Sequence, residues 1–207
     1  MPKIRATTIE EHKEQTRLDI LSWAEKLFVS QGYNATSLTE VADAVGIGRT
    51  TLYEYFPNKD HLIVGLVEAV VGPRLVPVLA DLPSSDRDRI AALLERVLVG
   101  VSMEPELTQL VFRVGRKLPT DLQTRMWESL NPVTNEIGAC CARGVASGEF
   151  AAAKPALLGR AVADLFTGAI EEVLRSQRPR EHVAAVFESY SGFIDRGLGV
   201  GDASTAR

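Results

Sequence analysis

Cysteine is scarce in this chain of 207 residues, which contains only Cys140 and Cys141. A disulfide between sequence neighbours is strained, and two cysteines allow no wider disulfide framework. The two thiols are therefore interpreted as small buried helix residues rather than a redox sensor. This usage of cysteine fits a reducing compartment, and we expect the protein in the cytoplasm.

Long apolar runs and a leader pattern are also missing. No uninterrupted apolar run reaches the length of about 18 residues that a membrane span needs. The nearest one, residues 62–82, is interrupted by Glu68, Pro73, Arg74 and Pro77. The N-terminus is polar and has no signal-peptide pattern. We expect no transmembrane helix and no membrane partner.

The chain has no excess of positive charge. It carries 23 Lys and Arg against 27 Asp and Glu, a formal net charge of −4. Residues 1–60 alone hold seven basic and nine acidic residues. Proteins that bind DNA without sequence preference need a strongly basic surface, so the composition argues against that class. A nucleic-acid site in this chain must depend on where individual basic residues lie.

The motifs of common enzyme classes are absent from the sequence. It has no G-x-S-x-G nucleophile motif, no phosphate-binding P-loop and no dinucleotide fingerprint. The three histidines, His12, His61 and His182, are too scattered to indicate a metal site. We expect neither an enzyme nor a bound metal or cofactor.

The chain does contain helical periodicity throughout. Hydrophobic residues make up 45% of it, enough for a sizeable core. No strand pattern stands out, and the fold class expected is all-α with about nine helices. The expected helices cover residues 16–31, 38–45, 48–56, 58–70, 86–103, 105–118, 121–147 with a kink at Pro132, 155–177 and 180–196.

Residues 37–56 have the pattern of a helix-turn-helix. Ser37 is a good N-cap for the helix from Leu38, and Glu40 completes a capping box. Gly46 supplies the tight turn to the next helix. The preceding helix carries one apolar stripe to cover both, formed by Ile20, Leu21, Ala24, Leu27 and Phe28. This three-helix arrangement places a recognition helix in the major groove of DNA.

The recognition helix has two distinct faces. Leu52 and Phe56 are four residues apart and face the core, with Gly48 one turn earlier on the same side. Three residues then lie on an exposed face, and two more lie beside it: Arg49, Thr50 and Tyr53, flanked by Thr51 and Tyr55. Arginine can read a guanine edge or hold a phosphate, and threonine and tyrosine suit the backbone or a thymine methyl.

Phosphate contacts are expected at both edges of this unit. Lys59 stands at the start of the next helix, where its charge suits a phosphate. Thr36 and Ser37 lie at a helix N-terminus, whose backbone N–H groups suit an anion. Glu54, beside the recognition face, either repels phosphates or is turned away.

The stretch ILSWAEKLFVSQGYNATSLTEVADAVGIGRTTLYEYFPNKDHLIVGLVE closely resembles the N-terminal domain of the tetracycline-repressor (TetR) family. The matching motifs are A–LF–––GY–ATS, VADAVGI and TLYEYFPNKDHL, in order and without gaps over about 50 residues. By position, the residues that fall where the family contacts DNA are Thr36, Arg49, Thr50, Thr51, Tyr53, Tyr55 and Lys59, and Ser37 caps the second helix. Gly48 departs from the family, which usually has a serine or a similar cap there.

The resemblance implies a domain organisation and a mode of action. It implies a DNA-binding domain at 1–60 and a helical ligand-binding and dimerisation domain at 61–207. It also implies a homodimeric repressor that binds a palindromic operator in double-stranded DNA and pairs through its last two helices. The sequence permits that pairing, because small and apolar residues recur at helical spacing there, at Ala161, Ala163, Leu165, Gly168, Ala169, Val173, Val183, Ala184, Ala185, Phe187 and Ser191.

A small-molecule inducer, partly apolar, is expected within residues 86–176. The candidate lining residues are apolar side chains with a few polar anchors, namely Met103, Phe112, Met126, Trp127, Leu130 and Phe166 with Arg113, Arg116 and Asn131. Each apolar candidate also fits plain core. The alternative function is a helical ligand-binding module that has lost DNA binding, which the negative charge and Gly48 favour.

Overall fold

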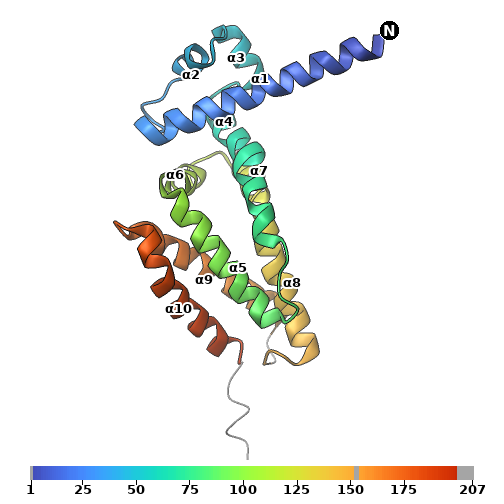
Figure 1. The fold of residues 1–207 in the computed structure, drawn as a ribbon, viewed down its shortest axis with the longest axis vertical. Helices are drawn as coiled ribbons and strands as arrows, with labels where there is room; N and C mark the ends of the chain where they lie inside the picture. Colours follow the sequence, from blue (N-terminus) through green and yellow to red (C-terminus); the bar gives the residue numbers. More distant parts are fainter. Residues whose placement is uncertain (1, 152–153, 200–207) are drawn as a thin grey trace, which may run out of the picture. The chain divides into compact units, whose positions relative to one another are not determined.

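The computed structural model describes residues 2–151 and 154–199, which are helical apart from short connections (Figure 1). The α-helices are α1 (Pro2–Gln31), α2 (Leu38–Val45), α3 (Arg49–Tyr55), α4 (Lys59–Leu66), α5 (Asp86–Met103), α6 (Pro105–Gly115), α7 (Thr120–Glu128), α8 (Asn131–Ser147), α9 (Pro155–Arg175) and α10 (Pro179–Gly197). A π-helical turn, η1 (Val67–Val71), and a 3₁₀ helix, η2 (Gly72–Leu79), follow α4. The all-α prediction is confirmed.

Two helix predictions are wrong in their extent. Residues 121–147 form two helices, α7 and α8, instead of one helix kinked at Pro132. Pro132 is the second residue of α8, where the missing N–H leaves no helical hydrogen bond unmade. The first helix begins at Pro2, well before the predicted start at residue 16.

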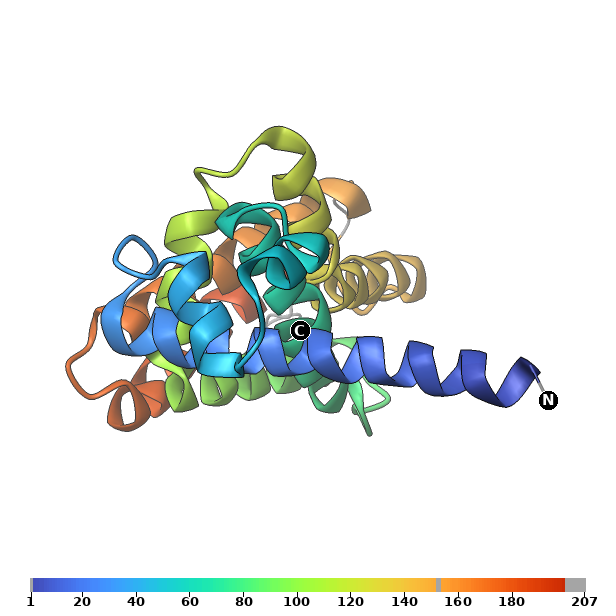
Figure 2. The same cartoon turned by 90° about the horizontal axis from the view of Figure 1, so that it is seen from above.

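The chain packs as two units, and the first comprises residues up to Arg74 together with Glu106–Leu130. Its core contains the predicted stripe of α1, in which Ile20, Leu21 and Ala24 are fully buried. Residues 8–15 of α1 are all exposed, and this half of the helix extends away from α2 and α3 (Figures 1 and 2). Only the second half of α1 therefore supports the helix-turn-helix.

The apolar segment Lys59–Leu79 is long and apolar enough to cross a membrane by length and composition alone. In this structure it is divided among α4, η1 and η2. Leu62–Val67 is buried, and its hydrophobic side chains belong to the core of the first unit. The apolar side chains of α4 are thus used for packing inside the first unit, whereas η2 has no buried residue and Val76 is exposed.

Gly65 in α4 leaves space for the ring of Phe56, at the C-terminal end of α3. A Cβ atom there would lie 2.6 Å from Cε1 of Phe56, which is the residue that ends α3. Phe56 is 5% exposed because its ring fills this position against α4. Glycine at residue 65 therefore lets the recognition helix pack closely onto α4.

The second unit comprises Leu75–Pro105 and the chain from Asn131 onward. Helices α5, α8, α9 and α10 pack on one another around an apolar core that includes Ile90, Leu94, Ile137 and Phe166. This division follows packing. The functional boundary after residue 60 stays a prediction.

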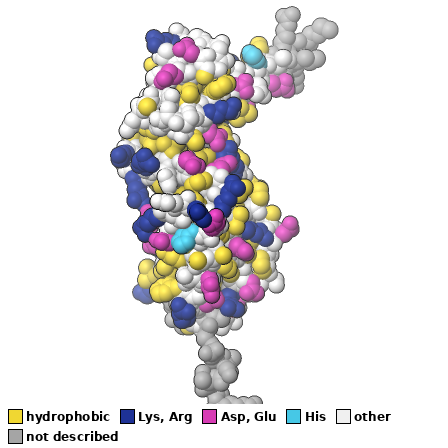
Figure 3. Space-filling view, turned by 60° about the vertical axis from the view of Figure 1, so that its left-hand side comes forward, with side chains coloured by type: hydrophobic (Ala, Val, Ile, Leu, Met, Phe, Trp, Pro, Cys, Tyr) yellow, Lys and Arg dark blue, Asp and Glu magenta, His cyan; other side chains and the backbone are white. Residues whose placement is uncertain are grey.

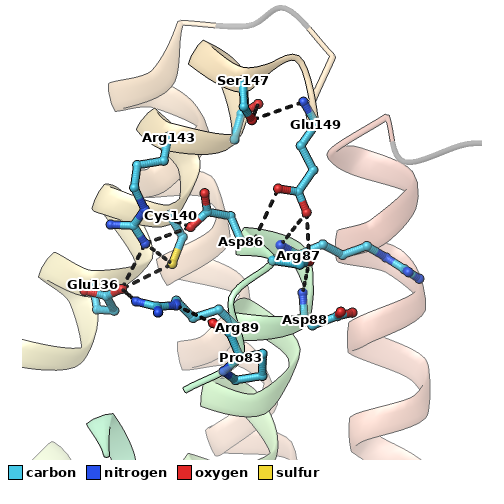
Figure 4. Close-up of polar contacts among 12 residues, drawn as sticks. Pro83, Asp86, Arg87, Asp88, Arg89, Glu136, Cys140, Arg143, Ser147 and Glu149 are labelled. Atoms are coloured by element: carbon cyan, nitrogen blue, oxygen red, sulfur yellow. Dashed lines mark hydrogen bonds and ion pairs between the residues drawn. The ribbon is translucent and has the colours of Figure 1, made fainter. Parts of the chain in front are cut away.

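Ion pairs join the start of α5 to α8 inside the second unit (Figure 4). The Arg143 guanidinium donates to Oδ1 of Asp86 at 2.7 Å and to Oε1 of Glu136 at 3.0 Å. Beyond the end of α8, the Glu149 carboxylate accepts hydrogen bonds from the N–H groups of Asp86 and Arg87. The Glu149 carboxylate thus satisfies two N–H groups at the start of α5 that have no partner within the helix. The ion pair of Arg143 with Asp86 holds the same turn against α8.

Candidate nucleic-acid interface

The turn between α2 and α3 is built as the sequence predicts. Ser37 Oγ accepts from the N–H of Glu40 at 3.2 Å, and Glu40 Oε2 accepts from the N–H of Ser37 at 2.7 Å, so the predicted capping box is present. Gly46 ends α2 with φ of 81°, the left-handed conformation that favours glycine. The N–H groups of Gly46 and Ile47 both donate to the carbonyl of Ala42.

Helix α3 presents the two faces that its sequence predicts. Leu52 is fully buried, while Arg49 and Thr50 are exposed and Tyr53 is 52% exposed. Thr51 and Tyr55 are half-buried at the flanks. The exposed face therefore offers a guanidinium, two hydroxyl groups and one aromatic ring to a partner.

Gly48 does not lie on the core side, and that prediction is wrong. It is the N-cap of α3, is exposed, and makes no side-chain cap. Helical spacing does not apply to it because its backbone is extended, with φ of −68° and ψ of 147°. A Cβ atom there would meet only Thr51 Oγ1, at 3.8 Å, so a larger residue fits.

Lys59 is half-buried, and its ammonium group is bonded within the chain. Its Nζ donates to the carbonyl of Tyr33 at 2.6 Å and to that of Asn34 at 3.3 Å, and it lies 4.6 Å from the centre of the Tyr33 ring. The Tyr33 hydroxyl in turn donates to Oδ1 of Asp60 at 2.6 Å. Burial, together with this hydrogen bond to the Asp60 carboxylate, raises the pKa of Tyr33.

These contacts tie the start of α4 to the loop between α1 and α2. Tyr33 and Asp60 were not among the predicted site residues, although they lie in the stretches GY and NKDHL that carry the resemblance. The hydrogen bond between them could not be predicted from local spacing, because the two residues are 27 positions apart in the sequence. The three side chains fix the loop behind the recognition helix.

Thr36 and Ser37 also have partners within the chain. Thr36 is 1% exposed, and its hydroxyl donates to the carbonyl of Gly32 at 2.9 Å. Its N–H donates to the same carbonyl, and the N–H of Ser37 is taken by Glu40. Both residues therefore shape the start of α2, and the predicted contact from them to DNA stays a prediction.

Charge of both signs surrounds the interface. Glu54 is exposed and lies next to Tyr53 on α3. On the face drawn in Figure 3, Lys and Arg are interspersed with Asp and Glu. Recognition by this surface must therefore depend on specific contacts from α3 more than on a broad positive field.

The residues predicted to line an inducer pocket lie in both units. Met126 is fully buried in the first core, where Phe112 and Trp127 stack edge to face at 5.7 Å and Leu130 packs nearby. Phe166 belongs to the core of the second unit, where Met103 and Asn131 are exposed. Arg113 and Arg116 are exposed on and just beyond α6. The role of these residues toward a ligand stays a prediction.

The two cysteines are fully buried, as predicted. Burial, with the nearby Glu136 carboxylate, raises the pKa of Cys140 to about 12. Burial also raises the pKa of Cys141 to about 11. Since the thiolate is the reactive form, neither thiol is activated near neutral pH. Among the described residues no group of His, Cys, Asp and Glu is arranged to hold a metal ion.

Comparison with known proteins shows what the N-terminal part of the chain is similar to. Residues 20–66 match the family model described as bacterial regulatory proteins, tetR family. An HTH-type transcriptional regulator of Bacillus subtilis strain 168, YuxN, is 33% identical over 79 residues, 38% of this chain and 27% of the relative. The chain thus spans about a quarter of the length of that relative.

Two further comparisons cover most of the chain. The fatty acid metabolism regulator protein of Bacillus subtilis strain 168 is 22% identical over 167 residues, 78% of this chain and 83% of that protein. The crystal structure of the transcriptional regulator FadR from Bacillus subtilis, in complex with stearoyl-CoA, superposes with a TM-score of 0.70 at 16% identity, covering 84% of this chain and 97% of that one. The second comparison supports the observed fold over the 84% of this chain that it covers.

Proposed function

We propose that this chain is a member of the tetR family of bacterial regulatory proteins, whose model its residues 20–66 match, and that it is a sequence-specific DNA-binding transcriptional regulator. In this proposal it is a cytoplasmic repressor that leaves a palindromic operator when a small molecule binds. Residues 1–60 bind DNA, and residues 61–207 bind the ligand and the partner subunit.

The observation that carries the proposal is the two-faced recognition helix. Leu52 and Phe56 anchor α3 on the core, and Gly46 sets its angle to α2. Arg49, Thr50 and Tyr53 then project to solvent without an ion-pair or hydrogen-bond partner among the described residues. Every amphipathic surface helix exposes a polar face. What supports the proposal is the chemistry of this one, because its guanidinium, hydroxyl groups and flat ring suit a helix that enters the major groove.

We propose different roles for two groups of the predicted contact residues. Arg49, Thr50 and Tyr53, with Thr51 and Tyr55 at the flanks, are proposed to contact bases and phosphates. Thr36, Ser37 and Lys59 are proposed to hold α2 and the loop before it in place, because their polar groups are already bonded within the chain.

Dimerisation through α9 and α10 is part of the same proposal. Ala169 and Val173 are buried in the core of their own unit, so they are not available to a partner. The outward residues remain, including Ala184, Ala185 and Phe193, the last of which is 56% exposed. Two subunits related by a two-fold axis would present two α3 helices about one or more turns of DNA apart.

The ligand is proposed to be a partly apolar small molecule bound in the helical body. The fold resemblance to a regulator solved with stearoyl-CoA supports this class without identifying the molecule. Coupling between such a site and DNA is typically about 1–3 kcal/mol. A release of about 5- to 150-fold is therefore expected when the ligand binds.

A mobility-shift assay on genomic DNA fragments tests the proposal. Arg49→Ala and Tyr53→Ala are expected to weaken the shifted complexes, each by about 1–3 kcal/mol if the lost contact is to a base. Lys154→Ala is a control, because it removes one exposed positive charge in the loop before α9. If the parent protein is folded and dimeric and shifts no fragment, the alternative of a ligand-binding module without DNA binding is supported instead.

A further inference from the structure

A cavity of about 460 Å³ lies inside the first unit, between the C-terminal end of α1 with its following loop and one face of α6. Its size falls within the range of about 300–1,000 Å³ typical of small-molecule sites. Phe28, Val29, Leu110, Val114 and Leu118 give it an apolar lining. It therefore has room and surface for an apolar body of one or two rings.

The α6 wall of the cavity carries an ordered set of charges. Glu106, Arg113 and Lys117 line it at positions i, i+7 and i+11 of one helical face and its continuation. Glu106 is about 10 Å from Arg113 along the helix axis, at a rise of about 1.5 Å per residue. The wall thus has a negative end and a positive end.

Arg113 and Lys117 are not neutralised by the protein. Both are exposed, and within the part of the chain that the structure describes neither forms an ion pair or a hydrogen bond through its side chain. Other arginines of the first unit differ, because Arg74 pairs with Glu25 and Arg125 with Glu68. Two cations without an ion pair at one end of a partly apolar cavity suit an anionic group of a ligand. The cavity is also lined by the acids Glu106 and Asp60, and the carboxylate of Asp60 accepts the hydrogen bond of Tyr33.

We infer that this cavity binds an amphipathic monoanion, a small ring-containing molecule with one carboxylate or sulfonate group. The apolar lining takes the rings, and Arg113 and Lys117 take the anion, the former through its planar guanidinium. Glu106 disfavours a second negative charge at the other end. The site is separate from the proposed inducer site in the helical body, since of those candidates only Arg113 lines it.

A ligand here would touch the support of the recognition helix. The loop residues Gly32, Tyr33 and Asn34 line the cavity, and the carbonyls of the latter two accept the hydrogen bonds of Lys59. Binding would therefore change how the loop before α2 is held. This consequence for DNA rests on the proposed function, whereas binding itself does not.

Titration of the full-length protein with the fluorescent probe anilinonaphthalene sulfonate, without DNA, tests the inference. The probe has fused rings and a single fixed negative charge. Arg113→Gln and Lys117→Gln are each expected to weaken probe binding by about tenfold, the effect of losing one charge-assisted hydrogen bond. Val29→Trp keeps all charges but fills the cavity, and it should also abolish this binding.

Lys13→Gln is the matched control, because it removes the same charge from an exposed part of α1 outside the cavity. Acetylation by acetic anhydride gives a second readout in the parent protein. The probe should protect Lys117 and leave Lys13 as reactive as before, as measured by peptide mass spectrometry. Both results together support the site.

Three outcomes overturn the inference. They are a parent protein that does not bind the probe, equal binding by the parent and the three cavity variants, and acetylation of Lys117 that is unchanged by the probe. Binding in the helical body alone would give the second and third outcomes. Because no DNA is present, a failure of the proposed function leaves this test unaffected.

Discussion

Replacement of Lys59 by methionine separates two roles for this residue. One is a contact to a DNA phosphate, and the other is a structural role, in which Lys59 holds the loop before α2. Methionine keeps most of the length of the side chain but removes the terminal ammonium with its charge and donors. The structure predicts that Lys59→Met lowers the free energy of unfolding, because Nζ donates to the carbonyls of Tyr33 and Asn34 and lies over the Tyr33 ring.

The magnitude follows from these three contacts. A hydrogen bond from a charged donor contributes about 1.5–3 kcal/mol, and the 2.6 Å bond to Tyr33 is of this kind. The longer bond and the half-exposed cation–π contact each add less, and partial desolvation of the ammonium offsets part of the sum. A net loss of about 2 kcal/mol is expected, which lowers Tm by about 4–8 °C for a chain of this length.

The assay combines thermal unfolding with the salt dependence of DNA binding. Each phosphate contact contributes about 0.9 to the slope of log affinity against log salt. If Lys59 has the structural role and does not contact phosphate, Lys59→Met lowers Tm and leaves that slope unchanged. Lys26→Met is the control, because Lys26 lies 4.4 Å from the centre of the Trp23 ring but donates no hydrogen bond among the described residues. An unchanged Tm with a slope reduced by about one would refute the reasoning.

Three further predictions follow from the structure. Gly48→Ser should raise the free energy of unfolding by a few tenths of a kcal/mol, because serine caps α3 better and fits there; an unchanged denaturation midpoint would contradict it. Cys140 and Cys141 should resist iodoacetamide at neutral pH and react once the protein is unfolded, since burial raises both pKa values; rapid native alkylation would contradict this. Burial acts to raise the pKa of Glu136, but hydrogen bonds from Arg89 and Arg143 outweigh burial, so the pKa of Glu136 is lowered. The pKa of Glu149 is also lowered, mainly because its carboxylate accepts a hydrogen bond from the backbone N–H of Arg87. Both groups therefore stabilise the fold above the ordinary glutamate pKa of about 4.5, and urea midpoints should fall as the pH drops below it, less so in Glu136→Gln.

Local signals in the sequence predicted the helix-turn-helix well. Ser37, Glu40 and Gly46 act through neighbours three or four residues away, so caps and turns can be read from spacing. The division of residues 121–147 was missed because Pro132 fits both a kink and a first turn. The sequence has no local signal to choose between them.

Contacts over long sequence separations could not be predicted. Lys59 sits where a phosphate contact is expected, yet its Nζ is bonded to a loop 25 and 26 residues earlier. Likewise, Met126 was a ligand candidate by type, and packing against Gly115 uses it as core. Such outcomes depend on how helices pack, and periodicity alone does not determine that.

Selection of bound fragments from sheared genomic DNA by the purified protein, at near-physiological salt, tests the central claim most directly. The account predicts recovery of a palindromic sequence by the parent protein and its loss with Arg49→Ala, while Lys154→Ala recovers the same palindrome. Recovery of no common sequence by a folded, dimeric parent protein would contradict the claim that α3 reads DNA.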